Sequence, residues 1–361
     1  MQTLHSEEVF LSEIDGFRNE LALIDREIME LVGRRNKIAL VIGEKKAAAG
    51  EEVVVPSVEK IVVQRYVDAG KNSGVSAEAA SRIARVVIDE SVDVQGMIPR
   101  RAVPRKIFII GGNGGMGRWL SAFFTARGHS VIINDPRIDG ASYPVKDIPS
   151  GCRDADVIVV STPIGISAGI LEEIFSEKNN ALIFDILSTK SLIIPVLRKA
   201  AASGARVCSV HPMFGPGATS IAGRNIIVCN CGNGAAVEEA ARLFNGGVII
   251  RMEVEEHDQV TAYVLGLSHA VNLAFTGALA KSGFSSEILY AAASTTFRKQ
   301  VAVSEEVSRE NARLYYAIQK DNPWNDAAIQ NLLASLMELR SSGEDAFVEK
   351  MQSDSAWYPE K

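Results

Sequence analysis

His211, one of five histidines in the 361-residue chain, stands where a side chain could do chemistry. It follows the apolar run ARVCSV and opens the Pro/Gly-rich stretch HPMFGPG. Because proline has no amide hydrogen to donate to a neighbouring strand, Pro212 is expected to end a strand here. An imidazole at such a strand end can accept a hydroxyl proton near neutral pH. Position alone leaves two interpretations open: a catalytic base, or a histidine that merely caps a strand.

A glycine-rich loop offers a second kind of chemistry, the binding of phosphate. Gly112, Gly114 and Gly117 have the G-x-G-x-x-G spacing directly after the run KIFII and before a helical stretch. The first glycine permits a tight turn, the second lets a pyrophosphate approach the backbone, and the third lets helix and strand pack closely. We therefore predict a dinucleotide site that also includes Gly115 and Met116, because the amides that open such a helix bind phosphates. A glycine turn without a nucleotide is the alternative.

An acidic residue predicts which dinucleotide binds. The second strand of this βαβ unit ends in Asp135, near the spacing of about 20 residues that the motif requires. A carboxylate there accepts a hydrogen bond from a ribose 2′-hydroxyl and repels a 2′-phosphate, which favours NAD over NADP, although Arg137 lies close by. The next strand ends in three further expected cofactor residues: Ser161, Thr162 and Pro163.

Ser188 and Lys190 follow another predicted strand, in the stretch ALIFDILSTK. Because the carboxyl ends of parallel strands meet at one edge of a sheet, Ser188 and His211 could be neighbours there. The Ser188 hydroxyl could then orient the imidazole, although a helix N-cap is an equal alternative. For Lys190, a solvated lysine at the start of a helix is at least as good an interpretation as a site residue.

Cations interrupt an apolar stripe in the first hundred residues. Arg35 occupies a stripe position that should be apolar, and Arg18 and Lys46 lie close to the stripe. A buried cation is costly unless something anionic meets it, so the pattern predicts an anionic ligand. A coiled-coil arm with Arg35 as a register device is the alternative. The apolar residues of the stripe follow one another at steps of three and four, except where Arg35 stands between Leu31 and Ile38. They are Ile14, Phe17, Leu21, Ile24, Ile28, Leu31, Ile38 and Ile42.

The elements that must position these residues form three segments. Residues 11 to about 98 have only helical periodicity, and a helix from about 11 to 49 is so long that we expect a dimer to cover it. Seven apolar runs then alternate with helical stretches, which is typical of a parallel sheet. The rest is Ala-rich and helical. The predicted fold class is multidomain α and α/β: an all-α domain over residues 1–100, a Rossmann-like domain over 104–258 and an all-α dimerisation domain over 259–361.

Composition narrows the function classes. A net charge of -6 argues against nucleic-acid and anionic-membrane partners, and 47% hydrophobic with 23% charged residues describe a soluble globular protein. No run approaches the ~20 apolar residues of a membrane helix, and no secretory signal opens the chain. The four cysteines form no C-x-x-C pair, so we predict no metal and reduced, buried thiols in the cytoplasm.

Together these residues resemble two known families. The first segment is similar to the all-helical class of chorismate mutase, and the remainder resembles prephenate dehydrogenase through the loop GGNGGMG, D-x-x-S-x-K at 185–190, HPMFGP at 211–216 and EHD at 256–258. The order resembles the bifunctional T-protein family of tyrosine biosynthesis, over residues 11 to about 320. The residues that carry the mutase resemblance are Arg18, Ile24, Asp25, Arg35, Gly43, Lys46, Glu59, Ser91 and Gln95.

For the second segment, the resemblance implies oxidative decarboxylation of prephenate to 4-hydroxyphenylpyruvate. His211 would accept the proton of the ring hydroxyl while hydride leaves the same carbon for the nicotinamide. Ser188 would hold His211 in orientation, Arg298 would bind a substrate carboxylate and His269 would line the pocket. The EHD sequence could equally be a helix start. Because HPMFGP does not read the substrate's side chain, arogenate is an alternative substrate.

For the first segment, the resemblance implies rearrangement of chorismate to prephenate. That pericyclic reaction needs a restrained conformer and a stabilised ether oxygen. Val58 stands where the family usually has an arginine, so a non-catalytic dimerisation or regulatory module on a monofunctional dehydrogenase is the alternative. The implied roles are carboxylate binding by Arg18 of the partner subunit and by Arg35, contact with the ether oxygen by Lys46 and Gln95, contact with the ring hydroxyl by Glu59, and support by Ser91.

Overall fold

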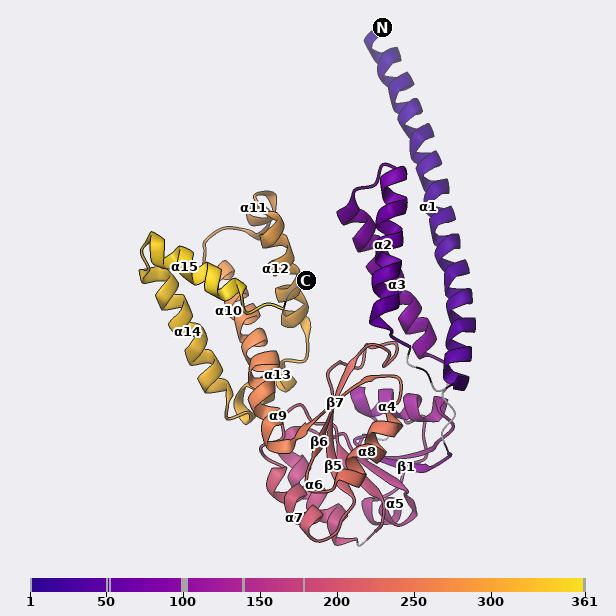
Figure 1. Cartoon of the computed structure of the whole chain (residues 1–361), viewed down its shortest axis with the longest axis vertical. Coiled ribbons are helices and arrows are strands. Elements are labelled where there is room, and N and C mark those ends of the chain that lie inside the picture. The colour runs from indigo at the N-terminus through magenta and orange to yellow at the C-terminus, as the bar shows by residue number, and fades with distance from the viewer. Residues whose placement is uncertain are drawn as a thin grey trace.

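Three helices, a seven-stranded sheet and a second set of helices follow one another along the chain (Figure 1). The structure is a computed structural model that describes residues 2–49, 51, 53–98, 103–137, 140–177 and 179–359, without the side chains of residues 2–13.

The N-terminal helices are α1 (Gln2–Ala49), α2 (Pro56–Asn72) and α3 (Ala77–Gly96). Proline in the first turn favours the start of α2, and the Ser76 side chain caps α3 by accepting a hydrogen bond from the amide of Ala79. Both α1 and α2 pack against α3, while the first half of α1 extends beyond them (Figure 1). The apolar stripe of α1 is therefore exposed along much of its length, including Phe17 at 66% and Ile28 at 51%.

The sheet has the strand order β2-β1-β3-β4-β5-β6-β7. Each of the seven predicted strands is present, and β1 to β5 are parallel. The sheet is mixed rather than wholly parallel, because β6 runs antiparallel to β5. No helix occurs between these two strands, so the chain returns directly. The strands are β1 (Lys106–Ile110), β2 (Ser130–Asn134), β3 (Val157–Val160), β4 (Leu182–Asp185), β5 (Val207–Pro212), β6 (Asn225–Asn230) and β7 (Val248–Glu253).

Helices cover both faces of the sheet, which explains why its strands are near-continuous apolar runs. One core cluster joins the sheet to α4 and α8, through residues such as Phe124 and Phe244. The other joins the opposite face to α5, α6 and α7, through residues such as Leu171 and Leu197. The covering helices are α4 (Gly115–Ala126), α5 (Ile148–Asp154), α6 (Ile164–Ser176), α7 (Ile194–Ala202) and α8 (Gly234–Leu243).

The C-terminal part is helical, as predicted, and begins directly after the last strand. Helix α9 (Val254–Thr261), the π-helical segment η1 (Ala262–Leu267) and α10 (Ser268–Ala280) form one continuous helix, so the boundary expected at 258/259 falls inside it. The domain limits themselves remain a prediction. The later helices are α11 (Ser286–Ala291), α12 (Thr295–Arg309), α13 (Ala312–Asp321), α14 (Asn325–Ser341) and α15 (Glu344–Ser355).

The continuous helix Val254–Ala280 is long and apolar enough to cross a membrane by length and composition, with a mean hydropathy of 1.3 over its best window and 22% of that window buried. The sequence analysis found no apolar run of membrane-spanning length here, because polar residues interrupt the apolar residues of this helix. Those residues include His257, Asp258 and His269, all of which are buried in the protein.

Candidate active sites

The glycine loop turns between β1 and α4, and its glycines are required by close contacts. A Cβ at Gly117 would lie 2.1 Å from the carbonyl oxygen of Gly111, and one at Gly112 would lie 2.5 Å from the Ile133 side chain. Gly111 itself has φ +83°, a left-handed conformation that favours glycine. Helix α4 starts at Gly115, and the first turn of a helix leaves amide hydrogens free for an anion.

Asp135 lies directly beside this loop, as the motif predicts. Its carboxylate accepts hydrogen bonds from the amide of Asn113 at 3.0 Å and from the amide of Arg137 at 2.9 Å. The carboxylate is buried, whereas the Arg137 side chain is mostly exposed, with Nε 3.4 Å from Asp135 Oδ1. A tight glycine cradle with an acidic residue at its rim fits a dinucleotide, whose pyrophosphate the α4 amides would bind and whose ribose hydroxyl Asp135 would accept from.

The residues after β3 reach the same edge of the sheet. A Cβ at Gly111 would lie 2.3 Å from the carbonyl oxygen of Ser161, so the two turns are in close contact. The hydroxyl of Thr162 is 2.8 Å from that of Ser167 in the first turn of α6, and Pro163 is the N-cap residue of that helix. The structure therefore brings the expected cofactor residues of β1, β2 and β3 together.

His211 lies one residue before the end of β5, which Pro212 ends as predicted, and its partner is a second histidine. Its Nδ1 is 2.9 Å from Nε2 of His257, and Nδ1 of His257 is 2.7 Å from Oδ1 of Asp258. All three side chains are buried. Burial lowers the pKa of His211 well below its ordinary value, with further lowering by His257 and the nearby Lys190 ammonium. The imidazole of His211 is therefore neutral at pH 7 and can accept a proton.

The loop after β4 anchors the Asp258 carboxylate. It accepts hydrogen bonds from the amides of Lys190 and Ser191, at 2.9 and 2.8 Å, and from the Ser191 hydroxyl at 2.5 Å. Lys190 is fully buried, and its ammonium donates to Asp185 Oδ1 at 2.7 Å and to the Val210 carbonyl at 2.9 Å. The interpretation of Lys190 as a solvated lysine is therefore wrong, because a carboxylate and a carbonyl satisfy its charge inside the protein.

Ser188 does not orient His211 in this structure. No hydrogen bond from its hydroxyl is found among the described residues, and His257 occupies the Nδ1 side of the imidazole instead. Ser188 does not cap a helix either, since α7 begins at Ile194. The residue that contacts His211, His257, belongs to the EHD sequence that the sequence analysis noted. Its position in a predicted helix gave no indication that its side chain reaches back to β5.

The two residues expected from the helical tail make no hydrogen bond or ring contact with His211 among the described residues. His269, on α10, is buried and stacks on Tyr315 with ring centroids 4.0 Å apart; in the part of the chain that the structure describes its Nδ1 has no hydrogen-bond partner, and burial lowers its pKa. Arg298 is exposed on α12 and donates to the Tyr290 carbonyl at 3.2 Å. Figure 1 shows α11 and the start of α12 at the end of the helical part remote from the sheet. This chain alone does not bring Arg298 to His211.

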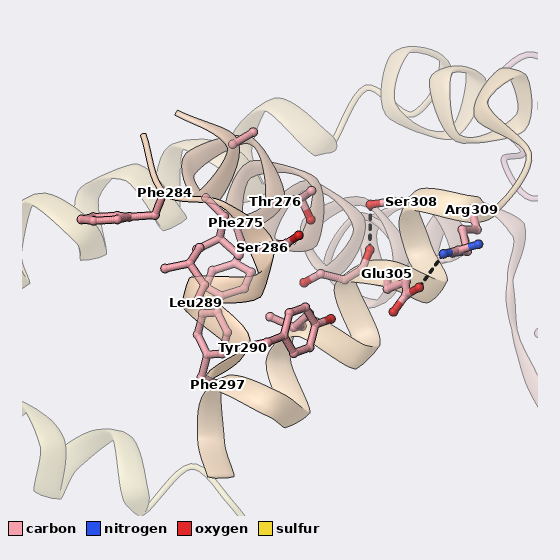
Figure 2. Close-up of a pocket in the computed structure, with 14 residues that line it drawn as sticks. Phe275, Thr276, Phe284, Ser286, Leu289, Tyr290, Phe297, Glu305, Ser308 and Arg309 are labelled. Atoms are coloured by element: carbon pink, nitrogen blue, oxygen red, sulfur yellow. Dashed lines mark hydrogen bonds and ion pairs between the residues drawn. The ribbon is translucent and has the colours of Figure 1, made fainter. Parts of the chain in front are cut away.

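An apolar cavity of about 360 Å³ lies in that remote region, among α10, α11 and α12. Figure 2 shows aromatic side chains such as Phe275 and Phe297 at one side of it and the ion pair between Glu305 and Arg309, 2.6 Å apart, at the other. None of the residues predicted to do chemistry lines this cavity, so it is separate from the candidate active sites.

The cations of the first segment converge between α1 and α3. Arg35 donates to the Val87 carbonyl at 2.7 Å and to the Ser91 hydroxyl. Lys46 donates to the Val53 carbonyl at 2.9 Å. Gly43 permits this packing, because a Cβ there would lie 2.9 Å from the Gln95 side chain.

Gln95 has a buried polar atom that a ligand could satisfy. Its Nε2 donates to the Ser91 carbonyl at 3.0 Å, while its buried Oε1 has no hydrogen-bond partner among the described residues. The oxygen and nitrogen of an amide are assigned from the bonds they make, and the opposite assignment would turn a free donor toward the site.

The other two expected mutase residues are less enclosed. Glu59 is half-buried on α2. Arg18 is exposed on α1 and pairs only with Asp15, at 2.9 Å, among the described residues. The resemblance assigns Arg18 to the site of a partner subunit, which is consistent with its distance along α1 from Arg35 and Lys46.

Fold and geometry define the class of this protein. A glycine cradle, an acidic residue at its rim and a buried, neutral histidine at the same edge of the sheet are the parts of a Rossmann dehydrogenase. An all-helical segment with clustered cations is fused to its N-terminus.

Comparison with known proteins identifies the family. The model for chorismate mutase type II matches residues 17–96, that for the prephenate dehydrogenase nucleotide-binding domain matches 138–245, and that for the prephenate dehydrogenase dimerization domain matches 253–353. The chain is similar to the T-protein of Enterobacter agglomerans, at 23% identity over 96% of this chain and 94% of that protein. It is also 24% identical to the T-protein of Haemophilus influenzae, over 97% and 93%.

A solved structure supports the fold. Prephenate dehydrogenase from Aquifex aeolicus, in complex with hydroxyphenyl propionate and NAD+, has a TM-score of 0.57 and 19% identity, covering 71% of this chain and 97% of that chain. The chain belongs to the bifunctional chorismate mutase/prephenate dehydrogenase family of tyrosine biosynthesis.

Proposed function

We propose that the chain, as a cytoplasmic homodimer, rearranges chorismate to prephenate between α1 and α3 and then oxidises prephenate to 4-hydroxyphenylpyruvate at His211, with NAD as the cofactor. The observation that carries the second step is the neutral, buried imidazole of His211 at the sheet edge that also holds the glycine cradle.

His211 is the general base of the dehydrogenase. Its neutral imidazole takes the proton of the substrate's ring hydroxyl, so that the carbon–oxygen double bond can form. A nicotinamide held by the glycine cradle would supply the acceptor for the hydride on the same carbon. The ring carboxylate then leaves as CO₂, and its bonding electrons complete the aromatic ring and leave the former carbonyl oxygen as a phenolate. This oxygen takes up a proton to give the phenol, and loss of CO₂ with aromatisation makes the step irreversible. The enzyme needs no second base, because the departing carboxylate carries no proton.

Asp135 supports NAD rather than NADP. Both of its oxygens already accept backbone amide hydrogen bonds, which fix the carboxylate at the rim of the cradle. A fixed negative charge there repels a 2′-phosphate, while it can still accept from a 2′-hydroxyl. The exposed Arg137 already contacts Asp135 and would have to leave it to reach a phosphate.

The first segment acts by electrostatics and restraint. Arg35 and Lys46 lie on one face of α1, opposite Ser91 and Gln95 of α3, and their present partners include backbone carbonyls that a carboxylate ligand would replace. Charge-assisted bonds to two carboxylates hold the reactive conformer, and a cation beside the breaking ether oxygen stabilises its developing charge. No proton transfer is required.

The exposed apolar surfaces support the homodimer. Phe17, Leu21, Ile24 and Ile28 form a stripe on α1 that is 45–66% exposed in the single chain. A second α1 along this stripe would bury it and would bring Arg18 of the partner toward Arg35. The apolar cavity among α10, α11 and α12 lies within the matched dimerization domain, and the same domain of a partner subunit would cover it (Figure 2). Four buried, unpaired cysteines fit a reducing cytoplasm.

Steady-state rates with each substrate and cofactor test the proposal. We expect kcat/KM for prephenate with NAD to exceed kcat/KM for arogenate with NAD, and also kcat/KM for prephenate with NADP, by at least about tenfold. A tenfold ratio corresponds to a difference of ~1.4 kcal/mol in activation free energy. Equal rates with NADP would remove the role given to Asp135, and faster oxidation of arogenate would replace the proposed substrate.

A further inference from the structure

We propose that Asp258 and His257 are positioning residues that fix the tautomer of His211, so that Nδ1 carries the proton and Nε2 carries the lone pair that receives the substrate proton. This inference rests on the proposed dehydrogenase function. It adds which nitrogen of His211 accepts the substrate proton and why that nitrogen, Nε2, is the one that is unprotonated.

The order of hydrogen bonds dictates this tautomer. The Asp258 carboxylate is surrounded by donors, namely two amides and the Ser191 hydroxyl, so it is an ionised acceptor. Nδ1 of His257, 2.7 Å away, must therefore be the protonated nitrogen of that ring. A neutral imidazole has one donor and one acceptor, so Nε2 of His257 is an acceptor. Nδ1 of His211, 2.9 Å from it, must then donate. The only lone pair left on His211 is at Nε2.

Burial makes this order rigid. The side chains of His257 and Asp258 are 0% and 1% exposed, so water does not compete for their hydrogen bonds. The charged groups that face the chain of hydrogen bonds are the Lys190 ammonium and the Asp185 carboxylate, which pair with each other. Burial lowers the pKa of both histidines, and Lys190 lowers each further. Both rings are therefore neutral at pH 7.

Three parts of the fold hold Asp258 in place. The loop after β4 supplies the amides that bind its carboxylate. Helix α9, which begins directly after β7 with a capping box between Glu253 and Glu256, carries both His257 and Asp258. The Asn322 amide, at the end of α13, donates to the Asp258 carbonyl at 2.8 Å. The helical C-terminal part therefore determines the chemistry of a histidine that belongs to the sheet.

Asp258→Asn tests the inference. The amide oxygen would stay with the backbone donors, the amide NH₂ would face His257 Nδ1, and each imidazole would change tautomer. His211 Nε2 would then carry a hydrogen and could not accept one. We expect kcat for prephenate oxidation to fall by about 10²- to 10⁴-fold, as when a wrong histidine tautomer is enforced elsewhere. KM should change little, and the mutase activity of the same chain should be retained, which reports that the protein is folded.

A conservative pair at His257 separates positioning from packing. The amide oxygen of His257→Gln can accept from His211 Nδ1, whereas His257→Leu fills the space without an acceptor. We expect the glutamine variant to retain at least about tenfold more kcat than the leucine variant. Equal loss in both would show that His257 acts only by packing. Glu239→Gln is the matched control: Glu239 is a buried carboxylate bound by Arg105 and Arg206, directly before the starts of β1 and β5, and its loss should cost stability but not kcat.

A direct measurement does not depend on any variant folding. Nitrogen-15 NMR of histidine-labelled wild-type enzyme distinguishes protonated from unprotonated ring nitrogens, and we expect His211 to be protonated at Nδ1 in the neutral form. Protonation at Nε2 would overturn the inference, as would unchanged kcat in Asp258→Asn. If His211→Asn itself oxidises prephenate at the normal rate, the proposed function fails instead, so the two failures can be distinguished.

Discussion

At the scale of single residues, the site depends on buried groups whose partners lie far away in sequence. Lys190 resembled a surface lysine and EHD resembled a helix start, because sequence shows neighbours along the chain but not across it. The structure brings Lys190, Asp258 and His211 together from the ends of β4 and β5 and from α9. The strand-end position of His211 left a catalytic base and a strand cap equally open, and only the family resemblance favoured the base. The hydrogen bond between His211 and His257 was not predicted, because the orienting role was assigned to Ser188.

Arg35→Ala should abolish mutase activity and spare the dehydrogenase. Arg35 contacts Ser91 and the Val87 carbonyl within the helical segment and touches nothing in the sheet among the described residues. Loss of a charge-assisted carboxylate contact that is made in the transition state should lower kcat by at least about 10²-fold. Chorismate disappearance and prephenate oxidation should be measured on one preparation. A parallel loss of both would indicate instead that the fold or the dimer has collapsed.

Acid should destabilise the protein, starting near pH 6.5. Burial lowers the pKa of His211 and His257 in the folded state, so below about pH 6.5 the unfolded chain takes up protons that the folded chain does not. Stability is therefore complete above pH 6.5 and falls as the pH decreases, by at most about 1.4 kcal/mol per pH unit for each histidine. Urea unfolding at pH 7.5 and 5.5 measures this, and His257→Gln should reduce the slope. A free energy of unfolding that is constant or higher at pH 5.5 would contradict the prediction.

At the scale of elements, apolar runs were enough to locate all seven strands, and an apolar stripe at helical spacing was enough to predict the helical first segment and its long first helix. They did not show that β6 runs antiparallel to β5. An antiparallel return needs only a loop, and the loop that follows His211 was interpreted as a site motif rather than as the connection between these strands. Nor did they show the π-helical segment η1. There the Asn325 side chain lies against Gly266, where a Cβ would come within 2.0 Å of its Oδ1. Such a contact between distant elements leaves no periodic signal.

Gly117→Ala should prevent cofactor binding. Its Cβ would lie 2.1 Å from the Gly111 carbonyl oxygen, so α4 and the loop must move apart and the amides that bind phosphate move with them. We expect the Kd for NAD to rise by at least about tenfold while the mutase activity is retained. Gly169→Ala on α6 is the matched control, because nothing lies within 4 Å of its added Cβ. Equal NAD affinity in both variants would show that the loop is not the cofactor site.

At the scale of the whole molecule, two residues that the family resemblance assigns to the active sites lie exposed in the single chain. Arg18 is exposed on the extended part of α1, and Arg298 is exposed far from His211. The sequence predicted dimerisation from the length of α1, but a single chain cannot show which residues of the partner enter which site.

Complementation tests the partner's contribution. Arg18→Ala and Arg35→Ala should each lack mutase activity, yet co-expressed chains should regain it. In a two-fold symmetric dimer, random mixing leaves half of the molecules with one intact site, about a quarter of all sites. Activity near that level supports a site shared between subunits. No recovery in verified heterodimers would place Arg18 and Arg35 in the same chain's site.

The most direct test of the whole account supplies chorismate and NAD to the purified chain and follows NADH together with 4-hydroxyphenylpyruvate. We predict that wild-type enzyme forms both in equal amounts, whereas His211→Asn consumes chorismate, accumulates prephenate and forms no NADH while still binding NAD. Normal NADH formation by His211→Asn would contradict the account, and so would wild-type enzyme that leaves chorismate unchanged.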